Sequence, residues 1–86
     1  MMWIVYILEC GDGTYYTGIT NDLSQRIQAH TDGTGARYTR GRGPFVVKYT
    51  EECPDRSQAS KREIALKKLS RLDKEAIITK PVQRAR

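Results

Sequence analysis

Five side chains in this 86-residue sequence have the chemical types needed to act on a phosphodiester bond. They are two phenols, a guanidinium, an imidazole and a carboxylate, from Tyr6, Tyr16, Arg26, His30 and Glu63. Hydrolysis of a phosphodiester needs an activated water, a group that moves a proton, and charge stabilisation on the phosphate. This set therefore suits metal-assisted phosphodiester hydrolysis, provided that the fold brings the five side chains together.

The two tyrosines lie in a segment that is typical of a β-hairpin. Residues 3–9 and 14–20 are rich in aromatic and β-branched residues and flank a Gly-Asp-Gly turn. With a three-residue loop, Tyr6 lies opposite Gly18, and Tyr6 and Tyr16 share one face of the sheet. Gly18 would then leave space beside Tyr6 where a ligand could approach. A two-residue loop would place the tyrosines on opposite faces, and from the hairpin alone both tyrosines are explained more simply as packing residues.

A short helix is predicted directly after the hairpin. Residues 21–22 are Asn-Asp, which is a helix N-cap signal, and residues 23–30 follow with an apolar row. Arg26 and His30 are four residues apart and lie on the row beside it. A functional pair at the helix edge and an ordinary solvated arginine with a lone capping histidine are both open from the sequence.

The segment 31–43 is predicted to be a glycine-rich basic loop. It carries four glycines, and three arginines surround a single aromatic residue. Such a loop can approach a phosphate backbone and stack a ring on a base, which makes Arg37, Tyr38, Arg40 and Arg42, together with Gly18, candidates for nucleic-acid binding. A solvated loop is the ordinary alternative, but three arginines with no acid after Asp32 favour binding.

The remaining elements predict a small α+β (α/β) domain. A third strand is expected over residues 44–50, a turn over 51–55, a long helix over roughly 56–70 and a short helix over 73–78. The element order is then β-β-α-β-α-α, with a three-stranded, mainly antiparallel sheet flanked by helices. One domain over residues 1–80 and a basic tail over 81–86 are expected.

Glu63 is the only acidic residue of the long helix. The inward side of this helix is predicted to hold Ala59, Ala65, Leu66, Leu69 and Leu72. Glu63 lies four residues after Ala59 and three before Leu66, so it borders the apolar face. An ion pair with Lys67, worth about 0.3–0.5 kcal/mol, is one interpretation. A metal is the other, because a carboxylate beside a buried face needs a cation.

The charge balance favours a polyanionic partner. Fifteen Lys and Arg residues against ten Asp and Glu residues give a formal net charge of +5. Nucleic acid is the first expectation and an anionic membrane surface the second. No apolar run approaches the roughly 18 residues of a membrane span, and the N-terminus shows no charged leader. Two isolated cysteines without metal-ligand spacing fit a reducing cytoplasm.

The ordered set of motifs resembles the GIY-YIG nuclease domain. The first family motif reads Ile-Val-Tyr at residues 4–6, and the second reads Tyr-Thr-Gly at residues 16–18. The helical arginine, the histidine four residues later and the late helical glutamate match Arg26, His30 and Glu63. The resemblance extends from about residue 3 to about residue 78. It is greatest to small stand-alone bacterial members, and the chain is also similar to UvrC-type and branched-DNA-cutting nuclease domains.

The resemblance implies a metal-dependent DNA endonuclease. It makes Tyr6 the general base, places Arg26 on a phosphate oxygen, and gives Tyr16 and His30 roles in relaying a proton or orienting water. Glu63 would hold one Mg²⁺ or Mn²⁺, since a single carboxylate is normal for Mg²⁺. One acid at the site argues against a two-metal mechanism.

Two other functions remain open from the sequence. The same fold could serve as a nucleic-acid-binding module without activity, because fold alone does not establish function. It could also be a basic scaffold that docks on a protein. The chain shows no separate DNA-binding domain, so substrate specificity would come from its loops or from a protein partner. A monomer or weak dimer is expected.

Overall fold

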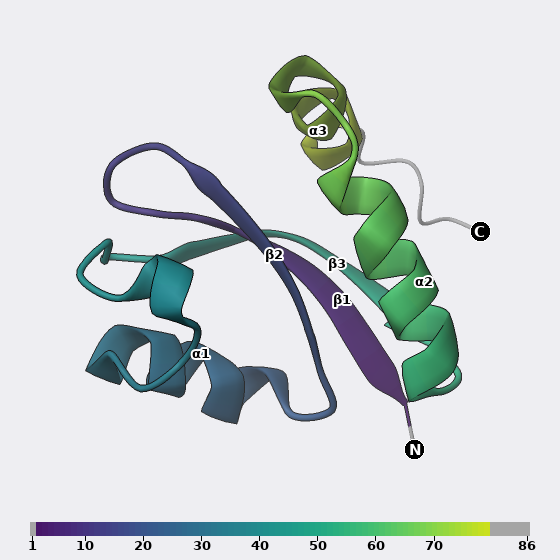
Figure 1. Ribbon diagram of the computed structural model, residues 1–86, viewed down its shortest axis with the longest axis horizontal. Coiled ribbons are helices and arrows are strands. Elements are labelled where there is room, and N and C mark those ends of the chain that lie inside the picture. The colour runs from purple at the N-terminus through teal and green to yellow at the C-terminus, as the bar shows by residue number, and fades with distance from the viewer. Residues whose placement is uncertain (1, 80–86) are drawn as a thin grey trace.

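The computed structural model describes residues 2–79 and has the predicted element order (Figure 1). The elements are β1 (Trp3–Glu9), β2 (Tyr15–Thr20), α1 (Leu23–Asp32), the 3₁₀ turn η1 (Arg37–Thr39), β3 (Val46–Cys53), α2 (Arg56–Lys67) and α3 (Arg71–Ile78). The α+β fold and its β-β-α-β-α-α order are confirmed. The predicted basic tail lies outside the described residues.

The hairpin forms in the predicted register. The sheet has the order β2-β1-β3 with both pairings antiparallel, so β2 and β3 are its two edges. Tyr6 pairs with Gly18 and Leu8 pairs with Tyr16. The turn is closed by the amide of Cys10, which donates to the carbonyl of Thr14 at 2.8 Å. The three-residue loop therefore puts both tyrosines on one face.

The two faces of the sheet are covered by different helices (Figure 1). Alternate residues of a strand point to opposite faces. Val5 and Ile7 point to the face that carries α2, and there they form the main apolar cluster with Cys53, Ala59 and Leu66. The other face carries Tyr6 and lies against α1. The sheet thus separates the apolar core from a polar, aromatic layer.

Helix α1 begins where the sequence predicts and ends two residues later. The Asp22 side chain caps it by accepting from the amide of Gln25 at 3.1 Å. The helix ends at Gly33, whose φ of 82° is the left-handed conformation that favours glycine at this position. His30 is thereby placed in the last turn of α1 and is its buried residue.

The C-terminal half differs from prediction in two places. The turn expected over residues 51–55 is wrong, because β3 continues to Cys53: Glu51 pairs with Val5 in the sheet. The two helices predicted over residues 56–70 and 73–78 are present with different bounds. Helix α2 ends at Lys67, and the Ser70 hydroxyl then caps α3 by accepting from the amide of Asp73.

The break between α2 and α3 also changes which residues are buried. Ala59 and Leu66 are buried as predicted, and Leu69 packs against the core. Ala65 and Leu72 were predicted to face inward and are exposed, with 77% of Leu72 accessible. A continuous helical period does not carry across a capped break, so Leu72 leaves the apolar row.

Candidate active site

Tyr6 and His30 form the centre of the polar layer. The Tyr6 hydroxyl lies 2.9 Å from Nε2 of His30, and the two side chains come from β1 and α1. Both are buried, with 0% and 1% of their surface exposed. A phenol and an imidazole at this distance share a proton, so they can exchange one during a reaction.

Tyr16 completes an aromatic cluster around this pair. Its ring centroid lies 5.3 Å from that of His30 and 6.3 Å from that of Tyr6. Gly18 makes the packing possible, because a Cβ there would lie 2.6 Å from the Tyr6 hydroxyl and 3.0 Å from the Tyr16 ring. The space beside Gly18 is therefore filled by the two tyrosines, and not left open for a ligand as the sequence suggested.

Arg26 lies beside both phenols at the edge of the cluster. Its interaction with the Tyr6 hydroxyl raises the pKa of the guanidinium, and Tyr16 adds to this effect. The Nε of Arg26 is buried and has no hydrogen-bond partner among residues 2–79. A pocket of about 340 Å³ opens beside it, lined by Thr20, Gln25, Arg26 and Ala29. A buried, unsatisfied cationic donor at a pocket suits an anionic ligand such as a phosphate.

The pKa values of the central pair move in opposite directions. Burial raises the pKa of Tyr6 above 10.0, the Arg26 guanidinium opposes this increase, and the charges of Tyr16 and Glu63 add to it. Burial lowers the pKa of His30 below 6.5, and the positive charge of Arg26 lowers it further. At pH 7 the phenol is therefore protonated and the imidazole is neutral, which leaves the imidazole able to accept a proton.

Glu63 lies on α2, the helix that covers the other face of the sheet. Its charge acts on Tyr6, and 20% of its side chain is exposed. The ion pair that the sequence allowed is present, with Lys67 Nζ at 3.3 Å from the Glu63 carboxylate. Among the described residues, no three His, Cys, Asp or Glu side chains gather as a metal cluster. One partly exposed carboxylate fits Mg²⁺ or Mn²⁺ that keeps most of its water ligands.

The arginine loop, residues 35–43, is held more tightly than its composition suggested. One face of the Tyr38 ring stacks on Tyr16 with 5.9 Å between centroids and 19° between planes. The Arg42 guanidinium lies 4.4 Å from the Tyr38 centroid and also forms an ion pair with Asp12 in the hairpin turn. Tyr38 and Arg42 are thus engaged within the protein, although 42% of Tyr38 is exposed.

Arg37 and Arg40 differ from Arg42 in their surroundings. Both are exposed, and neither forms an ion pair with any of residues 2–79. Of the three loop arginines, these two have charges available to a polyanion.

The structure adds three residues that sequence reasoning missed. Thr39 is 1% exposed, and its Oγ1 lies 2.7 Å from Nδ1 of His30. Gly35 lies against the same imidazole, since a Cβ there would be 2.6 Å from Nδ1. Asp12 anchors Arg42. A polar residue within the glycine-rich segment gave no periodic signal, so only the path of the loop could place Thr39 against His30.

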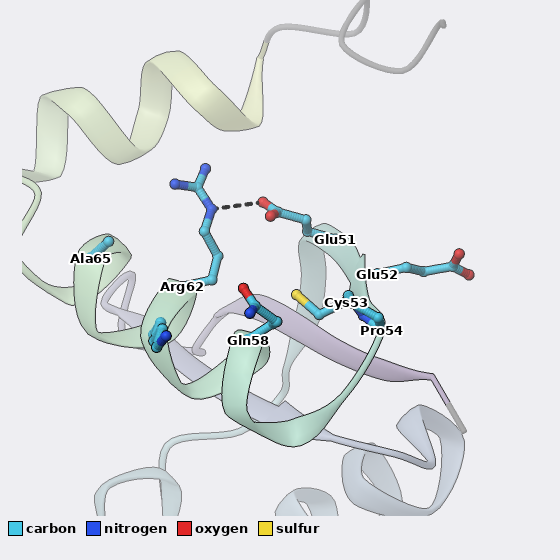
Figure 2. Close-up of a pocket in the computed structure, with 8 residues that line it drawn as sticks. Glu51, Glu52, Cys53, Pro54, Gln58, Arg62 and Ala65 are labelled. Atoms are coloured by element: carbon cyan, nitrogen blue, oxygen red, sulfur yellow. Dashed lines mark hydrogen bonds and ion pairs between the residues drawn. The ribbon is translucent and has the colours of Figure 1, made fainter.

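A second pocket lies away from this site, between the end of β3 and α2 (Figure 2). Its volume is about 370 Å³. The Glu51 carboxylate there accepts hydrogen bonds from the Tyr49 hydroxyl at 2.8 Å and from Arg62 Nε at 2.9 Å. The central charges of this pocket are paired with each other, whereas Arg26 at the first pocket has a donor to offer.

The structure is a compact α+β domain with a small antiparallel sheet. Two tyrosines of this sheet face the arginine and the histidine of α1. The chain belongs to the GIY-YIG family: the model of the GIY-YIG catalytic domain matches residues 2–76. This finding confirms the resemblance that the ordered motifs indicated.

Similar proteins within the family include UPF0213 proteins. The chain is 51% identical over 73 residues to UPF0213 protein VNG_2274C of Halobacterium salinarum. The matched residues cover 85% of this chain and 95% of that protein. The solution NMR structure of the UPF0213 protein BH0048 from Bacillus halodurans matches with a TM-score of 0.58 and 49% identity, over 91% of this chain and 83% of that one. The solution NMR structure of protein EF2693 from E. faecalis matches with a TM-score of 0.60 and 37% identity, over 88% of this chain and 82% of that chain. These names state no activity.

Proposed function

We propose that this protein is a metal-dependent endonuclease that hydrolyses phosphodiester bonds in DNA. The observation that carries the proposal is the buried Tyr6–His30 contact beside Arg26, whose buried Nε has no hydrogen-bond partner among residues 2–79. It combines a proton-transfer pair with a site for an anion. The match to the GIY-YIG catalytic domain supports the same reaction class.

Tyr6 is the proposed general base, and His30 makes that role feasible. With its pKa raised, the phenol is a poor base unless its own proton can leave. As water attacks the phosphorus, the water gives a proton to the Tyr6 oxygen while the phenolic proton passes to Nε2 of His30. The P–O3′ bond breaks, the 3′ oxygen takes a proton from solvent, and the imidazolium later returns its proton to solvent. Positioned proton transfer of this kind contributes typically 10²–10⁴-fold to a rate.

Arg26 and Glu63 are the residues proposed to stabilise charge during the reaction. The Nε of Arg26 donates to a non-bridging oxygen and stabilises the negative charge of the transition state. Glu63 would hold one Mg²⁺ or Mn²⁺, which would provide Lewis-acid stabilisation of the leaving oxygen. Tyr16 packs on His30 and orients the attacking water.

Arg37 and Arg40 extend the binding surface for DNA, in keeping with the net charge of +5. Gly18, Tyr38 and Arg42 contribute to this surface by holding the tyrosines and the arginine loop in place. The proposal includes a structured or branched DNA substrate and a protein partner that supplies specificity. The two buried free cysteines support a cytoplasmic location. No helix within residues 2–79 has the length and apolarity to cross a membrane.

A nucleic-acid-binding module without activity is the second candidate. The ion pair of Glu63 with Lys67 favours it, because a carboxylate already paired with an ammonium has a structural role of its own. Under this function, loss of the Glu63 charge leaves DNA binding unchanged or improves it.

A cleavage assay separates the two candidates. Single-stranded, duplex, flap and Holliday-junction DNA would be incubated with Mg²⁺, Mn²⁺ or EDTA, using wild type, Tyr6→Phe and Glu63→Gln. Glu75→Gln is the matched control, since Glu75 also forms a helical i,i+4 ion pair, with Arg71. We expect metal-dependent cutting by wild type and the control, and none by the other two variants. Salt-sensitive binding without any cutting would instead establish the binding module.

A further inference from the structure

The hydrogen bonds of Thr39 bear on which nitrogen of His30 carries the proton. A neutral imidazole has one N–H donor and one acceptor nitrogen, and its neighbours decide which is which. Nε2 faces the Tyr6 hydroxyl at 2.9 Å, and Nδ1 faces Oγ1 of Thr39 at 2.7 Å. Both neighbours are hydroxyls, which can donate or accept, so the distances to them alone leave both tautomers open.

The backbone of the arginine loop resolves this choice. The Thr39 hydroxyl donates its single proton to the carbonyl of Ala36 at 2.9 Å. With that proton committed, Oγ1 can only accept from His30, so Nδ1 must carry the N–H. Nε2 is then unprotonated and accepts from Tyr6.

Within residues 2–79, Thr39 is the residue that hydrogen-bonds Nδ1 of His30. Gly35 closes one side of it, because a Cβ there would lie 2.6 Å from Nδ1. The Phe45 ring lies 5.8 Å from the imidazole, centroid to centroid. His30 and Thr39 are each 1% exposed, so solvent is not a ready substitute for the Thr39 hydroxyl.

We propose that Thr39 is a positioning residue that fixes His30 as the Nδ1–H tautomer and so reserves Nε2 for the proton of Tyr6. A series of hydrogen bonds runs from Tyr6 through His30 and Thr39 to the carbonyl of Ala36, and each group donates to the next. The catalytic consequence rests on the proposed function; the tautomer itself does not.

The experiment uses the fact that His30 is the only histidine of the chain. Its two ¹⁵N chemical shifts and their couplings to the ring protons distinguish the tautomers in a spectrum with a single imidazole. Wild type is expected to show protonated Nδ1 and unprotonated Nε2 at pH 7.5. Thr39→Ser keeps a hydroxyl and should retain this tautomer. Thr39→Val replaces the hydroxyl with a methyl group of similar shape and should shift the population toward Nε2–H.

Activity provides a second readout. Thr39→Val should lower kcat on the order of 10²-fold with KM nearly unchanged, and Thr39→Ser should restore most of it. An Nε2–H tautomer in wild type would overturn the proposal, as would an unchanged tautomer in a folded Thr39→Val variant. If the tautomers behave as expected and no protein cuts DNA, the positioning role stands and the proposed endonuclease activity fails.

Discussion

Tyr6 and Gly18 face each other across the β1–β2 hairpin so closely that glycine is the residue that fits. A Cβ at position 18 would lie 2.6 Å from the Tyr6 hydroxyl and 2.8 Å from its ring carbon. In Gly18→Ala the Tyr6 ring must move, which disturbs its contact with His30. We expect a loss of about 1–3 kcal/mol in the free energy of unfolding from overpacking, which outweighs the gain of roughly 0.5–1 kcal/mol that alanine brings to a strand.

Urea unfolding of Gly18→Ala beside Gly43→Ala tests this relationship. A Cβ at Gly43 would have its nearest neighbour at 3.4 Å, an ordinary distance to the Phe45 ring. The control should therefore stay within about 0.5 kcal/mol of wild type. Equal stabilities of the two variants would show that the hairpin has room beside Tyr6.

Arg26→Gln should slow cleavage without unfolding the protein. The guanidinium lies at the edge of the cluster with a free buried Nε, and its removal takes charge stabilisation from the transition state. By comparison with the loss of a single oxyanion donor, kcat should fall on the order of 10²–10³-fold. Arg26→Lys keeps the charge but not the planar donor and should recover only part of the rate. Full activity of Arg26→Gln in single-turnover kinetics would remove Arg26 from the mechanism.

The three loop arginines should contribute unequally to the salt dependence of DNA binding. Arg37 and Arg40 are exposed, whereas Arg42 is already paired with Asp12. Each lost phosphate contact reduces the slope of log K against log salt by about 0.9. Arg37→Gln and Arg40→Gln should each show such a reduction, and Arg42→Gln much less. Fluorescence anisotropy between low and moderate salt measures the slopes, and a larger change for Arg42→Gln would contradict this assignment.

Stability should decrease as the pH falls below about 6.5. Burial lowers the pKa of His30 in the folded protein, whereas the pKa of histidine in the unfolded chain is about 6.5. Between these two pKa values the unfolded chain binds more protons than the folded protein does. Protons then favour unfolding. The stability that neutral His30 contributes is fully present above about pH 6.5, and it is lost as the pH falls through the pKa of His30 in the folded protein.

Urea unfolding at steps between pH 7.5 and pH 5.5 measures this loss. His30→Gln removes the titrating group and should flatten the dependence in that range, even if it lowers the stability overall. A stability of wild type that rises toward pH 5.5 would mean that His30 is charged in the folded protein.

The sequence predicted the hairpin and its register because local signals set them. A Gly-Asp-Gly turn and the Tyr6–Gly18 pairing need only residues close in the chain. It placed the end of α2 too late and put Leu72 on the apolar row of that helix, because Ser70 caps α3 and the helical period does not continue across this cap. It missed Thr39 because the contact with His30 depends on how a loop folds back, and composition does not encode that path. The stacking of Tyr38 on Tyr16 could not be predicted from the sequence for the same reason.

The arginine loop is joined to the hairpin turn backbone to backbone, and this has a consequence for recognition. The amide of Gly11 donates to the carbonyl of Arg42, and a Cβ at Gly11 would lie 2.2 Å from the carbonyl oxygen of Gly43. A loop fixed in this way loses little conformational entropy when it binds. The backbone positions of Arg37 and Arg40 are then held at a set separation. We therefore expect this surface to select among polyanions by the spacing of their phosphates as well as by total charge.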